Sequence, residues 1–211
     1  MPSPDEQAVI FRITHLDNLP WILEQGLVCR NGAPHDPGFR RIGSSDLIAK
    51  RADRAVPLQP GGTLADYVPF YFTPFSPMMQ NISSGYHGIE RIPNNRIVIL
   101  VSSLHEIRRC GLTFLFTDRH AYLQTAQYFD SLEQLQALDW SALQRRDFRR
   151  DIENPDKFDR YQAEALVHNQ VPVKALLGVV CHNPAVSEAV ERQAERLQRT
   201  LKVIARPRWY F

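Results

Sequence analysis

Hydrophobic and polar positions alternate in short stretches along the chain, and most stretches have the two-residue period of β-strands. Strands are predicted at 8–15, 66–75, 95–103, 112–118, 163–169, 178–183 and 201–211. The run "IVILV" within 95–103 is continuously apolar, which is typical of a strand buried on both faces. A sheet with that strand near its middle is therefore expected at the centre of the fold.

Helical spacing of apolar residues is less frequent. Asp17 or Asn18 can cap a short helix that Gly26 ends, and Ser44 or Ser45 can cap a second one. Helices are predicted at 17–27, 44–54, 119–138 and 184–200, with a helical turn at 172–178. The helices do not alternate regularly with the strands, so an α+β architecture fits better than a doubly wound sheet.

Length and composition indicate one domain over residues 1–211. With 211 residues and 44% hydrophobic content, the chain can bury a sizeable core without disulfides. Cys29, Cys110 and Cys181 have no metal-ligand spacing, and we interpret them as reduced packing residues. Neither a signal peptide nor a membrane span is recognisable, which predicts a cytoplasmic protein. The polar segment 28–62 is too long for a neutral connector and is predicted to be a functional loop.

The formal charge of +2 is too small to indicate a nucleic-acid-binding protein, but the cationic residues are clustered. One cluster holds Arg51 and Arg54, and a second holds Arg145, Arg146, Arg149 and Arg150. Arginine suits phosphate because its planar fork donates two parallel hydrogen bonds. The alternative is a solvated charged face, since aspartates are interleaved with the second cluster.

Glu164 interrupts an apolar alternation in "QAEALVH". In a strand, Ala163 and Ala165 face one side and Glu164 the other, with room around it. The segment alone favours a solvent-exposed carboxylate, and the alternative is a cleft carboxylate that acts as a base or stabilises a cation. His15 ends the first strand beside a helix start, where it is either a ligand contact or a capping or core residue. The aromatic residues of 67–75 are either core or a surface for stacking a planar ring.

Several familiar motifs are absent from the sequence. It contains no GxxxxGK[ST], GxGxxG, HExxH or GxSxG. This argues against P-loop ATP hydrolysis, Rossmann-type dinucleotide binding, zinc proteolysis and α/β-hydrolase chemistry.

Six segments, taken in order, resemble the DarT family of bacterial toxins, which are NAD-dependent ADP-ribosyltransferases that modify thymidine in single-stranded DNA. They are "ITHLDNLPWILEQGL", "GGTLADYVPFYFTPFSPMM", "RIVILVSS", "FTDRHAY", "RRDFRR" and "RYQAEALV". They span nearly the whole chain. The resemblance implies the ADP-ribosyltransferase fold, with split, mainly antiparallel sheets around an NAD cleft and peripheral helices, in agreement with the α+β prediction.

The resemblance also implies roles for individual residues. Glu164 would be the catalytic glutamate and Arg51 the arginine beside it, with Arg54 as a competitor for that role. The residues that would bind NAD+ are His15, Asn18, Tyr71, Arg51, Leu23 and Gly26. DNA contacts fall to Ser76, Met78, Met79, Arg54, Arg119, His120, Arg145, Arg146, Arg149 and Arg150. No metal is needed.

The implied reaction joins ADP-ribose from NAD+ to a ring nitrogen of thymine, which blocks DNA replication. A carboxylate can stabilise the oxocarbenium-like ribose and accept the thymine proton. Gln162, two residues before Glu164, argues against a protein arginine acceptor. An RNA or protein acceptor and a non-catalytic nucleic-acid-binding module remain alternatives. The expected partners are single-stranded DNA and a macrodomain antitoxin similar to DarG, and a monomer is expected.

Overall fold

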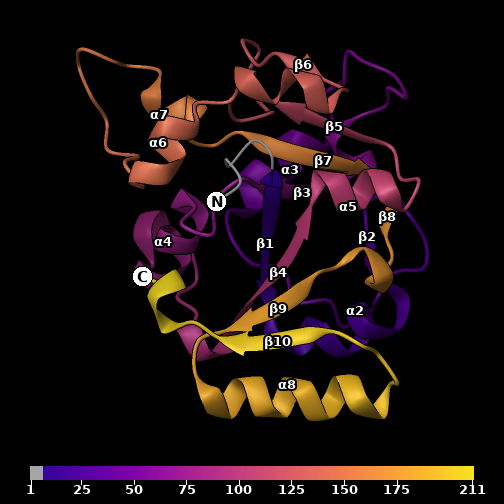
Figure 1. Cartoon of the computed structure of the whole chain (residues 1–211). Helices are drawn as coiled ribbons and strands as arrows, with labels where there is room; N and C mark the ends of the chain where they lie inside the picture. Colours follow the sequence, from indigo (N-terminus) through magenta and orange to yellow (C-terminus); the bar gives the residue numbers. More distant parts are fainter. Residues whose placement is uncertain (1–6) are drawn as a thin grey trace.

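The computed structural model describes residues 7–211, and an eight-stranded sheet forms its centre. The strand order is β10-β9-β4-β1-β3-β7-β5-β6, with every pair antiparallel except β10 and β9 (Figure 1). The strands are β1 (Val9–His15), β3 (Tyr67–Tyr71), β4 (Ile97–Ser103), β5 (Phe114–Thr117), β6 (Tyr128–Phe129), β7 (Glu164–His168), β9 (Gly178–Cys181) and β10 (Lys202–Ala205). A two-stranded sheet joins β2 (Leu27–Val28) to β8 (Gln170–Val171).

The large sheet is split between β1 and β3. These strands share one register pair, Phe11 with Tyr71, whereas β1 pairs with β4 along its whole length. Pro69 in β3 has no N–H to donate, and its carbonyl accepts a hydrogen bond from the Arg12 guanidinium at 2.8 Å instead. The two halves therefore diverge beyond the pair, and the predicted split, mainly antiparallel α+β fold is confirmed.

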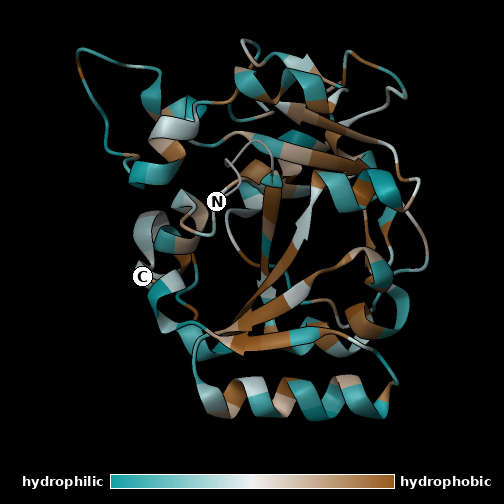
Figure 2. Ribbon diagram, in the orientation of Figure 1, coloured by the Kyte–Doolittle hydropathy of each residue, from teal (hydrophilic) through white to brown (hydrophobic). Residues whose placement is uncertain are grey.

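Both faces of the sheet are covered, which explains the apolar run of β4. Val98 and Leu100 belong to the larger core cluster, while Ile97 and Ile99 belong to a second cluster on the other face. Figure 2 shows brown, hydrophobic strands at the centre and mostly teal helices and loops outside. Burial on both faces follows directly from this pattern.

Most helices are short. They are α2 (Leu19–Gln25), α3 (Ser45–Ala52), α4 (Pro77–Ser84), α5 (Leu104–Arg109), α6 (Trp140–Arg145), α7 (Lys157–Arg160) and α8 (Pro184–Arg196). The 3-10 helices are η1 (Leu16–Asn18), η2 (Leu64–Asp66), η3 (Tyr86–Gly88), η4 (Asn94–Arg96), η5 (Leu132–Ala137), η6 (Val173–Ala175) and η7 (Pro207–Trp209). The longest, α8, lies against β10 and β9 (Figure 1). Across residues 7–211, no helix has the length and apolar character needed to cross a membrane.

Three predicted elements are wrong in extent, and one of them is the strand predicted at 66–75, which covers only Tyr67–Tyr71. Residues 119–138 form a loop, strand β6 and η5 rather than a helix, because Phe129 stacks on Phe116 of β5 and the Asp118 carboxylate accepts from the Gln127 N–H at 2.9 Å. The last strand ends at Ala205, and Pro207 begins η7. The helices α4, α5, α6 and α7 were not predicted.

Candidate active site

Glu164 is the first residue of β7, and it lies opposite Tyr71 of β3. The residue is 2% exposed, so the local expectation of a solvent-exposed carboxylate is wrong. Its neighbours Ala163 and Ala165 face the main core cluster, as the alternation predicted. Glu164 is covered by residues distant in the sequence, which the local pattern does not reveal.

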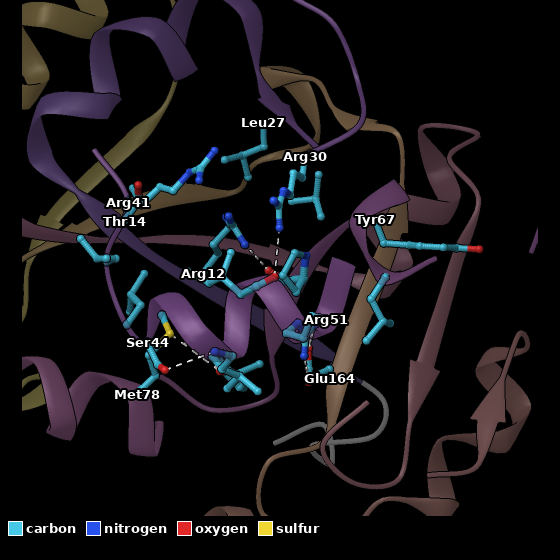
Figure 3. A pocket seen from close by; sticks show the side chains of 18 of the residues that line it. Arg12, Thr14, Leu27, Arg30, Arg41, Ser44, Arg51, Tyr67, Met78 and Glu164 are labelled. Atoms are coloured by element: carbon cyan, nitrogen blue, oxygen red, sulfur yellow. Dashed lines mark hydrogen bonds and ion pairs between the residues drawn. The ribbon is translucent and has the colours of Figure 1, made fainter. Parts of the chain in front are cut away.

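Arg51 of α3 makes a bidentate ion pair with the Glu164 carboxylate. Its two terminal nitrogens donate to Oε1 at 2.8 Å and to Oε2 at 2.7 Å, as Figure 3 shows. The backbone N–H of Ala121 donates to Oε1 at 3.0 Å. Arg54 donates to the Leu123 carbonyl at 3.1 Å instead. Of the two arginines that the sequence left unranked, Arg51 is thus the one that contacts Glu164.

The surroundings of Glu164 keep its carboxylate ionised. Burial alone raises its pKa, but the Arg51 charge and the hydrogen bonds from Arg51 and Ala121 together bring the pKa below its usual 4.5. Burial lowers the pKa of His120, which is therefore neutral at pH 7. Its Nδ1 accepts from the Tyr122 N–H at 3.2 Å and lies 3.4 Å from Glu164 Oε1. The site holds a charged carboxylate beside a neutral imidazole.

Glu164 and Arg51 line a cavity of about 1230 Å³. That volume exceeds the roughly 300–1,000 Å³ of sites for drug-sized ligands. Against two acidic residues, Asp36 and Glu164, seven arginines line the cavity: Arg12, Arg30, Arg40, Arg41, Arg51, Arg149 and Arg150. Figure 3 shows Arg12, Arg30, Arg41 and Arg51 around it. This charge distribution suits ligands that carry several phosphates.

The residues predicted to bind NAD+ fall into two groups. Tyr71 and Gly26 line the cavity, as does Arg51. His15, Asn18 and Leu23 are buried and do not line it. The His15 Nδ1 accepts a hydrogen bond from the Asp17 N–H at 3.1 Å, so His15 caps η1, in agreement with the capping alternative.

The residues predicted to contact DNA divide in the same way. Met78, His120, Arg149 and Arg150 line the cavity. Ser76 caps α4 through the Met79 N–H at 3.2 Å, and Met79 is core. The remaining predicted contacts have other partners: Arg54 pairs with Leu123, Arg119 with Asp118 and Arg145 with Ser141, and Arg146 lies over the Phe75 ring.

The sequence interpretation missed four of the cavity arginines, namely Arg12, Arg30, Arg40 and Arg41. Arg12 carries a signal that was available, because it is a cation at an inner position of the strand "VIFRITH". Burial lowers its pKa to about 10, so it stays charged. No described residue accepts a hydrogen bond from its buried Nε. The other three lie in irregular segments, where no periodicity marks a position.

Three comparisons place these features among known proteins. The model of the family described as ssDNA thymidine ADP-ribosyltransferase, DarT, matches residues 11–211. A DNA ADP-ribosyl transferase of Escherichia coli O127:H6 is 48% identical over 206 residues, covering 98% of this chain and 94% of that protein.

Solved structures agree. DarT from Thermus sp. 2.9 in complex with ADP-ribosylated ssDNA is similar with a TM-score of 0.89 and 36% identity, over 98% of this chain and 97% of that one. The same protein in complex with NAD+ gives a TM-score of 0.85 over 100% and 99% of the two chains. The chain therefore belongs to the DarT family of single-stranded-DNA thymidine ADP-ribosyltransferases.

Proposed function

We propose that this protein transfers ADP-ribose from NAD+ to a thymine base in single-stranded DNA, with Glu164 as the catalytic carboxylate. The observation that carries the proposal is the buried, ionised Glu164, held by Arg51 at the wall of a cavity lined by arginines. The related Thermus protein, with NAD+ and with modified DNA, supports both substrates.

The first chemical step breaks the bond between the nicotinamide nitrogen and the ribose. Nicotinamide leaves as a neutral molecule with the bonding electrons, and positive charge develops on the ribose. The ionised Glu164 stabilises that charge. Glu164 is only 2% exposed, and electrostatic stabilisation is stronger where water is excluded. A protonated carboxyl would not do so, which is why the lowered pKa of Glu164 matters.

In the second step the thymine ring nitrogen forms the new bond to the ribose carbon. Its proton passes to Glu164, which serves as general base. Arg51 donates two hydrogen bonds to the carboxylate, and turning one of them to a thymine carbonyl frees a carboxylate oxygen for the proton. That hydrogen bond also makes the ring N–H easier to deprotonate. Single-stranded DNA suits this step, since in a duplex the nitrogen is base-paired and extrusion costs a few kcal/mol.

Different cavity arginines are assigned to the two polyanionic substrates, NAD+ and DNA. Arg30, Arg40 and Arg41 lie in the irregular segment after β2 and are assigned to the NAD+ diphosphate. Tyr71 is assigned to the nicotinamide end of NAD+. Arg149 and Arg150 lie in the connection between α6 and α7 and are assigned to DNA phosphates. His15, Asn18 and Leu23 support the NAD+ wall without lining it.

A macrodomain antitoxin is the proposed protein partner, because the resemblance to DarT toxins implies an enzyme that removes ADP-ribose from DNA. The proposed location is the cytoplasm, where both NAD+ and DNA occur. Glu164, Arg51 and the cavity arginines all belong to one chain, and a monomer is proposed. Growth arrest on expression, relieved by a co-expressed active macrodomain but not by a catalytically dead one, would test the pairing.

The transfer itself is tested with NAD+ and a panel of oligonucleotides of varied sequence. Single-stranded DNA containing thymidine should gain the mass of one ADP-ribose, and fragmentation should place it on the thymine ring. A matched duplex and a panel without thymidine serve as controls. Label on RNA or on protein alone would contradict the proposal in favour of the alternative acceptors.

A further inference from the structure

The segment 33–43 is an irregular stretch of the cavity wall with a single main-chain anchor. It contributes His35, Phe39, Arg40 and Arg41 to the cavity lining, among others. Within the described part of the chain, only Arg40 joins the main chain of this segment to the rest of the protein by hydrogen bonds. Two further hydrogen bonds involve the main chain of this segment, and both are internal: the Phe39 N–H donates to the Asp36 carbonyl and the Gly38 N–H to the Asp36 carboxylate.

Asn18 is the partner of Arg40 in that anchor. Its Oδ1 accepts from the Arg40 N–H at 2.7 Å, and its Nδ2 donates to the Arg40 carbonyl at 2.8 Å. The amide thus binds both polar groups of one residue, as a neighbouring β-strand does. Nδ2 also donates to Thr14 Oγ1 at 3.0 Å, at the end of β1. Asn18 is 0% exposed, so its amide is shielded from water on its own side, whereas Arg40 is exposed.

The side chain of Arg40 gives the segment much weaker support. Its guanidinium contacts Glu90 at 3.0 Å and Asp17 at 3.7 Å, and all three side chains are about half exposed or more. Exposed ion pairs contribute little to stability. The buried amide of Asn18 is therefore the main polar restraint on the position of the segment, beside the packing of Ile42 against the second core cluster.

We propose that Asn18 is a positioning residue that acts on NAD+ through the main chain of Arg40 and does not touch NAD+ itself. By fixing Arg40 it holds the arginines of segment 33–43 where the diphosphate binds. This inference rests on the proposed function in one respect, the identity of the ligand as NAD+. The assignment replaces the direct contact between Asn18 and NAD+ that the sequence predicts.

Trypsin provides a test that needs no catalysis, since it cleaves after Arg40 and Arg41 once the segment opens. Asn18→Ala should speed cleavage at these two sites about tenfold, a change of about 1.4 kcal/mol that fits the loss of the two hydrogen bonds to the Arg40 main chain. Asn18→Asp keeps the side-chain volume but places a carboxylate against the Arg40 carbonyl, so it should also speed cleavage. This variant replaces Asn18→Ala in the test if the alanine variant fails to fold. Glu90→Ala is the control, because it removes the Arg40 side-chain partner and leaves both bonds to Asn18; its cleavage should match wild type.

NAD+ affinity and turnover complete the test. Asn18→Ala should weaken NAD+ binding by calorimetry, and raise the KM for NAD+, by about tenfold. The kcat at saturating NAD+ should stay within about twofold, because the Glu164–Arg51 pair is untouched. Weaker NAD+ binding with wild-type cleavage would overturn the inference and restore the direct contact, and a lower kcat with unchanged KM would also overturn it. Wild-type protein that binds NAD+ but labels no DNA would count against the proposed function alone, since cleavage and NAD+ affinity report on Asn18 independently.

Discussion

The two sides of the cavity, the one at Glu164 and the one formed by the segment 33–43, differ in how many hydrogen bonds hold them in place. Glu164 belongs to β7, which pairs with β3 on one side and β5 on the other, and its carboxylate receives hydrogen bonds from Arg51 and Ala121. The segment 33–43, by contrast, depends on the two hydrogen bonds that the Asn18 side chain makes with the Arg40 main chain. Local stability in proteins follows the number of buried contacts of this kind. We infer that the chemistry resides in the rigid part and NAD+ binding in the part that can open.

The largest effect is expected at Glu164. Glu164→Gln keeps the shape of the side chain but removes the charge that stabilises the ribose cation and accepts the proton. We expect kcat for thymine modification to fall by about 10²–10⁴-fold. The measurement is transfer to an oligonucleotide at saturating NAD+. Glu133→Gln, whose side chain is 76% exposed, is the matched control, with activity close to wild type. Equal activity of both variants would refute the assignment of the base.

Arg51 and Arg54 provide the next comparison. Arg51→Lys keeps the charge but loses the bidentate geometry at 2.8 and 2.7 Å, and should lower kcat by about 10–100-fold. Arg54→Lys should have a much smaller effect, because Arg54 donates to a carbonyl away from Glu164. Measuring kcat for both variants under the same conditions checks which arginine contributes more. A larger loss with Arg54→Lys would reverse the ranking of the two arginines.

The ion pair of Glu164 and Arg51 predicts a pH dependence of kcat. The pKa of Glu164 is lowered, so its ionised form persists as pH falls and is lost only below its ordinary value of 4.5. Its contribution to stability follows the same sign, being present at neutral pH and lost as pH falls through the lowered pKa. In Arg51→Lys the pKa of Glu164 should rise, and the acid limb of kcat should move to higher pH. The profile of kcat against pH measures this, and an unmoved limb would contradict the electrostatic role of Arg51.

A moderate effect is expected where the cavity meets DNA. Arg149→Ala with Arg150→Ala should weaken single-stranded DNA binding about tenfold and reduce the salt slope by about 1.4, since each phosphate contact on single strands adds about 0.7. The KM for NAD+ should hardly change. Binding measured across a salt series tests this, with Arg192→Ala on α8 as the control. Figure 1 shows α8 well away from the α6–α7 connection. An unchanged slope would exclude these arginines as phosphate contacts.

The sequence predicted the family and the α+β fold, and both are confirmed, because strand alternation and ordered motifs are local properties. The local pattern did not predict that Glu164 is buried, since the cover comes from α3, 113 residues earlier in the chain, and only the family resemblance implied a carboxylate in the cleft. The helix expected at 119–138 is wrong for a similar reason, because the pairing of Phe129 with Phe116 outweighs the local spacing. Asn18 shows the same limit, as its partner Arg40 lies in a segment without periodicity.

The smallest effect is expected at Tyr71, which faces Glu164 across the sheet and is the other ionisable group at that register position. Burial, and next the negative charge of Glu164, raise the pKa of Tyr71 to about 12, so the phenol stays neutral and cannot serve as the base at working pH. Its hydroxyl has only a weak contact with Met78 Sδ at 4.0 Å. Tyr71→Phe should therefore keep kcat/KM within about threefold, because little is lost with such a contact. Tyr71→Ala, which removes the ring from the cavity wall, should raise the KM for NAD+ more than Tyr71→Phe does. If Tyr71→Phe instead lost as much activity as Glu164→Gln, the proton would leave through the phenol, and the rigid side of the cavity would work through Tyr71 rather than through its carboxylate.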